Sequence, residues 1–470
     1  MRYRTSDALL LALAAALLTI AGCERDTAGL GPAPFNTDPV VFQDEFIGID
    51  FAAFAGSKLD ALDIDTEEGY RSDASIKISV PDQGDPSGGY AGGAITSNAP
   101  RDLSQYNAVT FWAKASRSAL LDGAGYGNDN TGTSKYMGGV SGIPLKTYWQ
   151  RYILPIPRTG KLVPERGLFF FAEADQVGEG YDVWFDEVEF TNVANISNPR
   201  PIMRQGDVSA IAGVPLAVEG TSTALDVSGV TVIVTHQAGY FTLESSNEDV
   251  AIPGEGVIHV VGGGTAEITA KLDTVIVAGR FTINALDPPS DAAPRPTIPA
   301  ADVISIFSNV YTNRPVDSFS PEWDTADVSD LKIAGDDVKV YNIPTQLDVA
   351  VIEFATQLID ATNMTHIHID IWVPQGTATT PFFGLGLFSF GPDGVFSGGN
   401  PPPAGDDSQW VVAIVQPELV FGEWLSLDIP LADFTVPGGL EETAHLAQII
   451  LRSDAVQLIV DNIFFYNDGN

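Results

Sequence analysis

Residues 183–190 read VWFDEVEF and residues 458–465 read LIVDNIFF, and this repeated strand-like pattern is the clearest architectural signal in the chain. Each stretch follows an earlier one that begins with tryptophan, WQRYILPI at 149–156 and WLSLDIPL at 424–431. Thirty-seven residues separate Trp149 from Asp186, and the same number separates Trp424 from Asp461. Matching motifs at equal spacing indicate two copies of one β module, called module one and module two below.

A third motif extends the match toward the N-terminus of each module. YNAVTFW at 106–112 is paired with MTHIHIDIW at 364–372, which aligns Trp112 with Trp372. From this tryptophan to the next motif the distance is 37 residues in module one and 52 in module two. The extra length lies in a Gly- and Pro-rich stretch, 391–407, which we expect to form a surface loop.

The fold class follows from short apolar runs bounded by turn residues. Residues 200–287 contain alternating runs at about ten-residue spacing with glycines between them, the pattern of a small β-sandwich. No long 3.6-residue helical pattern appears after the N-terminal segment. We therefore expect an all-β protein in which each motif tryptophan, Trp112 and Trp184 among them, lies in the core or at its edge.

Composition excludes several classes of function. The chain of 470 residues has 24 Lys+Arg against 61 Asp+Glu, a formal net charge of −37. Nucleic-acid phosphates and anionic lipid surfaces both require basic residues, so neither is expected as an electrostatic partner. The single cysteine excludes intramolecular disulfides and multi-cysteine zinc or iron–sulfur sites.

The only cysteine stands at the end of an apolar N-terminal run. Arg2 and Arg4 precede the run 8–21, and the segment LTIAGC ends at Cys23. This segment resembles the bacterial lipobox, which implies that 1–22 is a lipoprotein signal peptide and that Cys23 is acylated. The resemblance further implies a lipid anchor in the outer membrane or at the cell surface, with 23–39 as a tether. The alternative is an ordinary signal peptide followed by an incidental cysteine.

Both modules resemble jelly-roll carbohydrate-binding modules. Residues 40–195 are similar to the galactose-binding type, and residues 301–470 are similar to modules appended to laminarinase-type glycoside hydrolases. The stretches that carry the first resemblance are DLSQYNAVTFWAK (102–114), WQRYILP (149–155), GLFFFAE (167–173) and YDVWFDEV (181–188). Those that carry the second are VISIFSNVYT (303–312), SPEW (320–323), MTHIHID (364–370) and VDNIF (460–464). The implied fold is two jelly-roll β-sandwiches.

The central segment, 200–287, resembles the group 2 bacterial immunoglobulin-like repeat. The residues that carry this resemblance are SSNEDVA at 245–251, the Gly256–Val257 step and GGGTAEITA at 262–270. The family implies an immunoglobulin-like β-sandwich that serves as a spacer between surface modules. Residues 288–300 are rich in proline and predict a stiff, extended linker.

These resemblances imply a non-catalytic, lipid-anchored surface protein that binds polysaccharide through two modules, with neutral glucan-type chains favoured by the acidic surface. The expected partners are polysaccharide, the membrane through the lipid anchor, and other surface glycan-utilisation proteins. One alternative is a structural or adhesive surface protein with protein partners. The other is a glycoside hydrolase-associated protein with undetected activity, although the Glu-x-Asp-x-x-Glu strand that laminarinase families carry is absent from the sequence.

Sugar binding needs exposed aromatic rings beside polar side chains. In module one, the polar stretch 126–136 offers Tyr126 and Tyr136. In module two, Phe396 and Trp410 flank the predicted loop, near Phe388 and Phe390. The alternative for each of these residues is a role in the scaffold alone.

The protein requires no cofactor for this function, but the jelly-roll resemblance implies a structural calcium between the first and last strands. Asp44 and Glu45 in the first strand and Asp186 in the last are suitable oxygen ligands. The alternative is a solvated acidic edge on a very acidic protein.

Overall fold

The computed structural model describes residues 34–175, 178–343, 349–375, 382–397, 405–415, 418–454 and 457–469. The predicted signal peptide and Cys23 lie outside these residues. The predicted all-β class is confirmed: the described helices are three single turns, η1 (Ala238–Tyr240), η2 (Ala300–Asp302) and η3 (Leu431–Asp433). Among the described residues, no helix has the length and apolar character needed to cross a bilayer.

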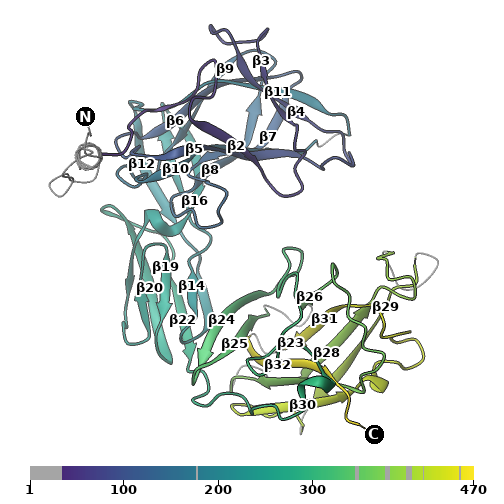
Figure 1. The fold of residues 1–470 in the computed structure, drawn as a ribbon. Helices are drawn as coiled ribbons and strands as arrows, with labels where there is room; N and C mark the ends of the chain where they lie inside the picture. The colour runs from purple at the N-terminus through teal and green to yellow at the C-terminus, as the bar shows by residue number, and fades with distance from the viewer. Residues whose placement is uncertain are drawn as a thin grey trace, which may run out of the picture.

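Module one, at the top of Figure 1, is built from two antiparallel sheets. The first sheet runs in the order β3 (Leu62–Asp65), β4 (Ser75–Val80), β11 (Tyr181–Thr191), β6 (Ala108–Ala115) and β9 (Gln150–Pro155), with β1 (Val40–Phe42) paired to β11. The second sheet contains β2 (Ile49–Ala53), β5 (Ala91–Arg101), β10 (Glu165–Glu173), β7 (Ala119–Tyr126) and β8 (Gly138–Leu145). Buried phenylalanines from both sheets, among them Phe111, Phe169 and Phe185, fill the space between them.

Module two repeats this topology. Its first sheet has the order β24 (Asp327–Ile333), β25 (Asp336–Asn342), β32 (Gln457–Tyr466), β27 (His366–Trp372) and β30 (Trp424–Pro430), with β23 (Val303–Phe307) on β32. Its second sheet has the order β26 (Ala350–Glu353), β31 (Leu446–Ser453), β28 (Phe382–Ser389) and β29 (Ser408–Val415). The strand orders of the two first sheets are the same, as the repeated motifs predict.

The repeated aspartate marks an irregularity in the last strand of each module. Asp186 and Asp461 are fully buried, and each accepts a hydrogen bond at 2.6 Å from the backbone N–H of the next residue. That next residue, Glu187 or Asn462, has a left-handed backbone with φ of 45° or 50°. This hydrogen bond from the backbone to the carboxylate stabilises a conformation that L-residues seldom adopt. The motif therefore encodes a kink in the last strand.

The strand pairing corrects one detail of the sequence alignment. Trp184, two residues before the buried aspartate, pairs with Lys114 in module one. Its counterpart Ile459 pairs with Trp372 in module two. Trp372 therefore corresponds to Lys114, and the predicted match of Trp372 to Trp112 was wrong by two residues. A two-residue shift preserves the inward and outward alternation of a strand, so hydrophobicity alone does not detect it.

The central segment contains two small sheets. One has the order β13 (Gly206–Ile211), β22 (Phe281–Leu286), β20 (Gly264–Leu272) and β17 (Thr242–Ser245), with β21 (Val275–Ile276) on β20. The other consists of β14 (Pro215–Ala217), β19 (Val257–Val260) and β18 (Ala251–Pro253). The resemblance to an immunoglobulin-like repeat stays a prediction.

The central segment also continues the second sheet of module one. β16 (Val230–His236) pairs with β8, and β15 (Ser222–Val227) and β12 (Ile196–Ile202) follow it to complete eight strands. A single hydrophobic cluster extends from module one into the central segment. The border near residue 200 therefore falls within one continuous sheet, and the two parts are fastened together by backbone pairing as well as by side chains.

A buried polar network stabilises the first sheet of module two. His368 lies between two carboxylates, with Nδ1 2.8 Å from Asp428 and Nε2 3.4 Å from Asp370. Asp370 also accepts hydrogen bonds from Ser426 and Asn462. Burial lowers the pKa of His368, but the two carboxylates outweigh burial and raise the pKa to about 9.

Module two should consequently lose stability between about pH 6.5 and pH 9. The imidazolium is more stable in the folded state, so its contribution is fully present below the unfolded pKa of 6.5 and disappears as pH rises through the folded pKa of about 9. Denaturant unfolding across this window should show a smaller decrease for His368→Gln than for the parent. The exposed His259 provides the control variant His259→Gln. An identical slope in parent and His368→Gln would contradict this assignment.

Candidate functional site

The outer face of the first sheet of module one carries aromatic and charged side chains together. Phe111 and Phe185 point into the core, so the strand alternation turns their neighbours Trp112 and Trp184 outward, where both are half-buried. Neither tryptophan is a core residue. Both are half-buried on the outer face, at the edge of the core, which is the second of the two predicted places. With Tyr70 and Trp149 they form a cluster called the aromatic face below.

Two carboxylates, the buried Asp186 and the exposed Asp44, hold the loop that completes this face. Asp186 accepts hydrogen bonds at 2.5 Å from the backbone N–H of Tyr70 and from Ser72 Oγ. Asp44 accepts hydrogen bonds from the backbone N–H groups of Asp73 (2.7 Å) and Ala74 (3.3 Å). The loop before β4 is thus tied down at consecutive points over the sheet.

This attachment places the Tyr70 ring on Trp112. The two ring centroids lie 3.6 Å apart with an interplanar angle of 17°, and Trp149 lies 6.1 Å from Tyr70. The Arg71 guanidinium lies 5.1 Å from the centre of the Tyr70 ring. The loop therefore adds an aromatic ring and a hydrogen-bond donor to a face that the strands alone would leave more open.

A row of three paired strand positions crosses the face. Lys77 on β4 and Lys114 on β6 stand on either side of Trp184. Their ammonium groups lie 5.6 Å and 4.8 Å from the centre of the Trp184 ring, and Lys114 is also 5.3 Å from the Trp149 ring. The cations pack over ring faces, an arrangement that is favourable where water is partly excluded.

Carboxylates neutralise this row. Lys77 pairs with Asp182 at 3.0 Å, and Lys114 pairs with Glu68 at 2.5 Å. Trp184 Nε1 donates a 2.9 Å hydrogen bond to Asp65, and this bond is the main cause of the lowered pKa of Asp65. The aromatic face thus combines aromatic rings with hydrogen-bond donors and acceptors, and each of its two lysines is paired with a carboxylate.

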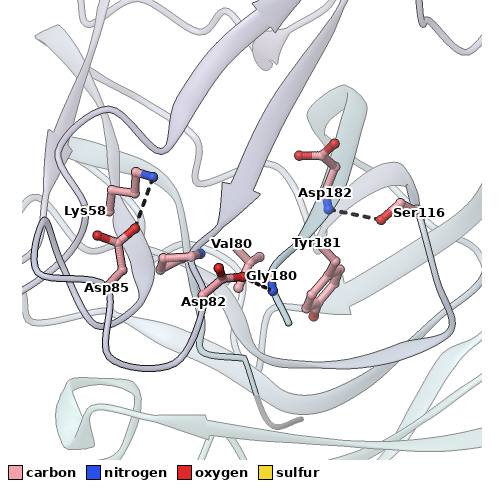
Figure 2. A pocket seen from close by; sticks show the side chains of 9 residues that line it. Lys58, Val80, Asp82, Asp85, Ser116, Gly180, Tyr181 and Asp182 are labelled. Carbon is pink, nitrogen blue, oxygen red and sulfur yellow. Dashed lines mark hydrogen bonds and ion pairs between the residues drawn. The ribbon is translucent and has the colours of Figure 1, made fainter. Parts of the chain in front are cut away.

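A shallow polar pocket of about 390 Å³ opens beside the end of this row (Figure 2). Asp182 belongs to both the row and the pocket. In the pocket, Lys58 pairs with Asp85 at 3.4 Å, and the Gly180 N–H donates to Asp82 at 2.6 Å. The pocket extends the hydrogen-bonding surface beyond the aromatic rings.

The corresponding row of module two is apolar. Val340, Ile459 and Trp372 occupy the positions of Lys77, Trp184 and Lys114. All three are buried, in a cluster with Ile211 and Leu286 of the central segment. The same sheet face is therefore covered by protein in module two, whereas two lysines occupy it in module one.

The structure separates the two tyrosines predicted for module one. Tyr126 is fully buried, and its hydroxyl donates to the Pro155 carbonyl at 2.9 Å, so it has no surface for a sugar and that prediction was wrong. Tyr136 is half-buried at the junction with the central segment, where its hydroxyl donates to Glu255 and its ring packs edge-on against Tyr240. These contacts give Tyr136 a structural role at the junction.

The predicted aromatic residues of module two remain accessible. Phe396 is 63% exposed and Trp410 is 37% exposed. Phe396 lies 5.5 Å from Phe390 and 6.5 Å from Phe388, so the structure brings these three rings together. We call them the phenylalanine patch, and their role in sugar binding stays a prediction.

Two of the residues predicted to bind calcium, Asp44 and Asp186, lie at the loop that bears Tyr70, and calcium binding there stays a prediction. Among the described residues, no group of three or more His, Cys, Asp or Glu side chains is arranged to hold a metal ion. Asp186 is buried, and both burial and the nearby Asp44 charge raise its pKa. Oxygens of both carboxylates already accept hydrogen bonds from the loop that bears Tyr70.

The sequence reasoning missed most of the aromatic face. Strict alternation from Phe111 through Ala115 was a usable signal, because it places Trp112 and Lys114 on the face opposite the core. Tyr70 had no such signal, because its position depends on hydrogen bonds to Asp186, 116 residues away.

No protein-family model matches the sequence. No curated protein matches it either.

Solved structures similar to this chain include carbohydrate-binding modules. One is the N-terminal CBM22-1–GH10 part of a Clostridium thermocellum xylanase with xylohexaose, at 15% identity and a TM-score of 0.23; the alignment covers 31% of this chain and 25% of that one. A family 11 module of a Clostridium thermocellum cellulosomal cellulase has 16% identity, a TM-score of 0.25, and coverage of 38% and 96%. A family 30 module has 20% identity, a TM-score of 0.26, and coverage of 33% and 98%.

Proposed function

We propose that this chain binds polysaccharide through the aromatic face of module one. The observation that carries the proposal is the arrangement of Trp149 and Trp184 on either side of Lys114, with carboxylates bonded beside them. The apolar face of a sugar ring packs on such rings, while its hydroxyl groups exchange hydrogen bonds with the adjacent amines and carboxylates. The polar pocket shown in Figure 2, which shares Asp182 with the face, supplies further hydrogen-bonding partners.

The preferred ligand in this proposal is a neutral, glucan-type chain. Both lysines of the face are already paired with carboxylates, so neither is free to hold an anion. The net charge of −37 on the whole chain adds long-range repulsion against acidic polysaccharides. A neutral polymer avoids both penalties.

The proposal describes a binding protein and not a hydrolase. The carboxylates of the aromatic face are engaged with partners, Asp65 with Trp184 and Glu68 with Lys114. Hydrolysis would require an acid and a base or nucleophile at a fixed separation across a bound sugar. Release of reducing ends from bound glucan by the purified chain would contradict this part of the proposal.

A second candidate function is docking of a protein partner. It is favoured by module two, where the equivalent sheet face packs against the central segment. That contact uses an apolar row, however, whereas the module one row contains Lys77 and Lys114. Burying these ion pairs in a dry protein interface costs more than leaving them beside a hydrated sugar. We therefore rank polysaccharide binding above protein docking.

Replacing a ring of the face should weaken glucan binding. We expect Trp149→Ala and Trp184→Ala each to reduce affinity for a neutral glucan such as laminarin about tenfold, or about 1.4 kcal/mol. Calorimetry and affinity electrophoresis measure this loss, with alginate as the polyanionic comparison. The control is Trp323→Ala, which removes a tryptophan that is 58% exposed in module two. Unchanged affinity in both face variants would contradict the proposed site.

The calcium prediction remains part of the proposal, with Asp44, Glu45 and Asp186 as ligands. A bound calcium would raise the thermal midpoint in millimolar calcium relative to chelator, because a ligand of the native state stabilises it by mass action. The rise should vanish in Asp44→Asn, and magnesium should not reproduce it. A midpoint that is the same in calcium and chelator would favour a solvated acidic edge.

We also propose that acylated Cys23 anchors the chain at the outer membrane or cell surface, beside other glycan-utilisation proteins. Two or three acyl chains hold a protein stably on a bilayer, whereas one chain does not. The parent should incorporate labelled fatty acid and sediment with membranes, and Cys23→Ser should do neither. Membrane association that persists without label in Cys23→Ser would reject the anchor.

A further inference from the structure

A groove of about 850 Å³ lies between the central segment and module two. One wall is formed by β13 and the residues around β14, and the other by β24, β25 and the start of β32. Figure 1 shows β14, β22 and β24 side by side in this region. The volume lies within the range of about 300–1,000 Å³ that small-ligand sites occupy in proteins.

The apolar contact described above fixes the width of this groove. Ile211 and Leu286 of the central segment pack against Val340 and Ile459 of module two. A methyl group added at Gly213 would lie 2.6 Å from Leu331 Cδ1, which shows how closely the two parts approach. The linker adds a hydrogen bond of 2.8 Å from Trp424 Nε1 to the Asp291 carbonyl. The groove therefore begins where the apolar contact between the central segment and module two ends.

The groove wall of module two is polar where the packed junction ends. Ser329 pairs with Val340, and Asp327 and Gln457 both pair with Asn342, so these polar side chains share the outer face of the sheet with the apolar row. Asp207 and Ser209 of β13 line the opposite wall. Hydroxyl, amide and carboxylate groups therefore face one space from both sides.

Gln457 provides a second, independent indication of a ligand. Its side chain is 5% exposed and lines the groove, yet its Oε1 has no hydrogen-bond partner. An unsatisfied buried acceptor costs about 1–3 kcal/mol, so a donor brought by water or by a ligand would stabilise the folded chain. Gln457 belongs to the groove lining, and a turn of its amide toward the groove would let a ligand with O–H groups supply that donor.

The charged side chains that line the groove restrict which ligands it can bind. Arg204 is paired with Glu219 at 3.4 Å, which leaves the carboxylates of Asp207 and Asp327 as the remaining charges of the lining. The net charge of the lining is therefore negative, which disfavours anionic ligands. Aromatic side chains are absent from the residues that line the groove, so recognition would depend on hydrogen bonds to a hydroxyl-rich molecule.

We infer that this groove is a second binding site, for a neutral oligosaccharide, with Gln457 Oε1 accepting a hydrogen bond from a sugar hydroxyl. The choice of a sugar as the ligand rests on the proposed function. The groove and the unpartnered amide oxygen are observations that do not depend on it. The site is distinct from the aromatic face, because it lies at the junction of two parts of the chain.

Hydrogen–deuterium exchange on the full chain tests the two sites separately. The probes are cello- and laminari-tetraose, each at a series of concentrations. We expect protection at 204–219 and at 327–342, in addition to protection near Tyr70 and Trp112. Protection near Tyr70 and Trp112 alone would overturn the groove site and leave the proposed function standing. Protection only at the groove would overturn the aromatic face as the sugar site and leave the groove site standing.

Two substitutions make the inference sharper. Gln457→Met keeps the size of the side chain and removes the acceptor, and Ser329→Trp fills the groove from its wall. Both should abolish protection at the groove and leave the affinity of the aromatic face unchanged, and Trp184→Ala should have the opposite effect. Ser329→Trp keeps the test decisive if Gln457→Met fails to fold. Undiminished groove protection in Ser329→Trp, or protection there by an extended peptide and not by either tetraose, would overturn the inference.

Discussion

The buried carboxylate of Asp186 is the interaction on which the exposed half of module one depends. It stabilises the kink in β11 by accepting a hydrogen bond from the Glu187 N–H. It also holds the loop before β4 by accepting hydrogen bonds from the Tyr70 N–H and from Ser72 Oγ. Its burial raises its pKa, a cost that these three hydrogen bonds partly offset. The aromatic face is thus a consequence of the fold itself, since the residue that shapes the last strand also positions the ring on Trp112.

One sheet face has acquired two different roles in the same chain. In module one, Trp184 lies between Lys77 and Lys114, and this row remains accessible to solvent. In module two, the equivalent row is apolar and buries itself against the central segment. The backbone topology is shared, so the difference comes from three side chains. Charged groups with bonded partners resist burial in a dry interface, whereas an apolar row in water favours association.

The sequence was sufficient for the features that repeat and insufficient for those that join distant segments. Equal spacing of Trp149–Asp186 and Trp424–Asp461 predicted two copies of one all-β module, and the strand orders agree. The outward position of Trp112 was encoded in the local alternation, although aromatic residues in an apolar run more often indicate a core. The burial of Trp372 agrees with the prediction for the motif tryptophans, but its contact with Ile211 of the central segment was not predictable, and neither was the place of Tyr70, which depends on Asp186, 116 positions away.

The connections between the three parts decide what two binding sites can achieve together. β8 and β16 join module one to the central segment through sheet pairing, and an apolar cluster joins the central segment to module two. A flexible tether would let two sites search many separations, with an effective concentration set by linker length. Fixed junctions instead present the aromatic face and the groove at one separation. If both proposed sites bind sugar, a polymer that spans this separation would gain from both and a shorter oligosaccharide from only one, so chain length would become a selection criterion in addition to sugar identity.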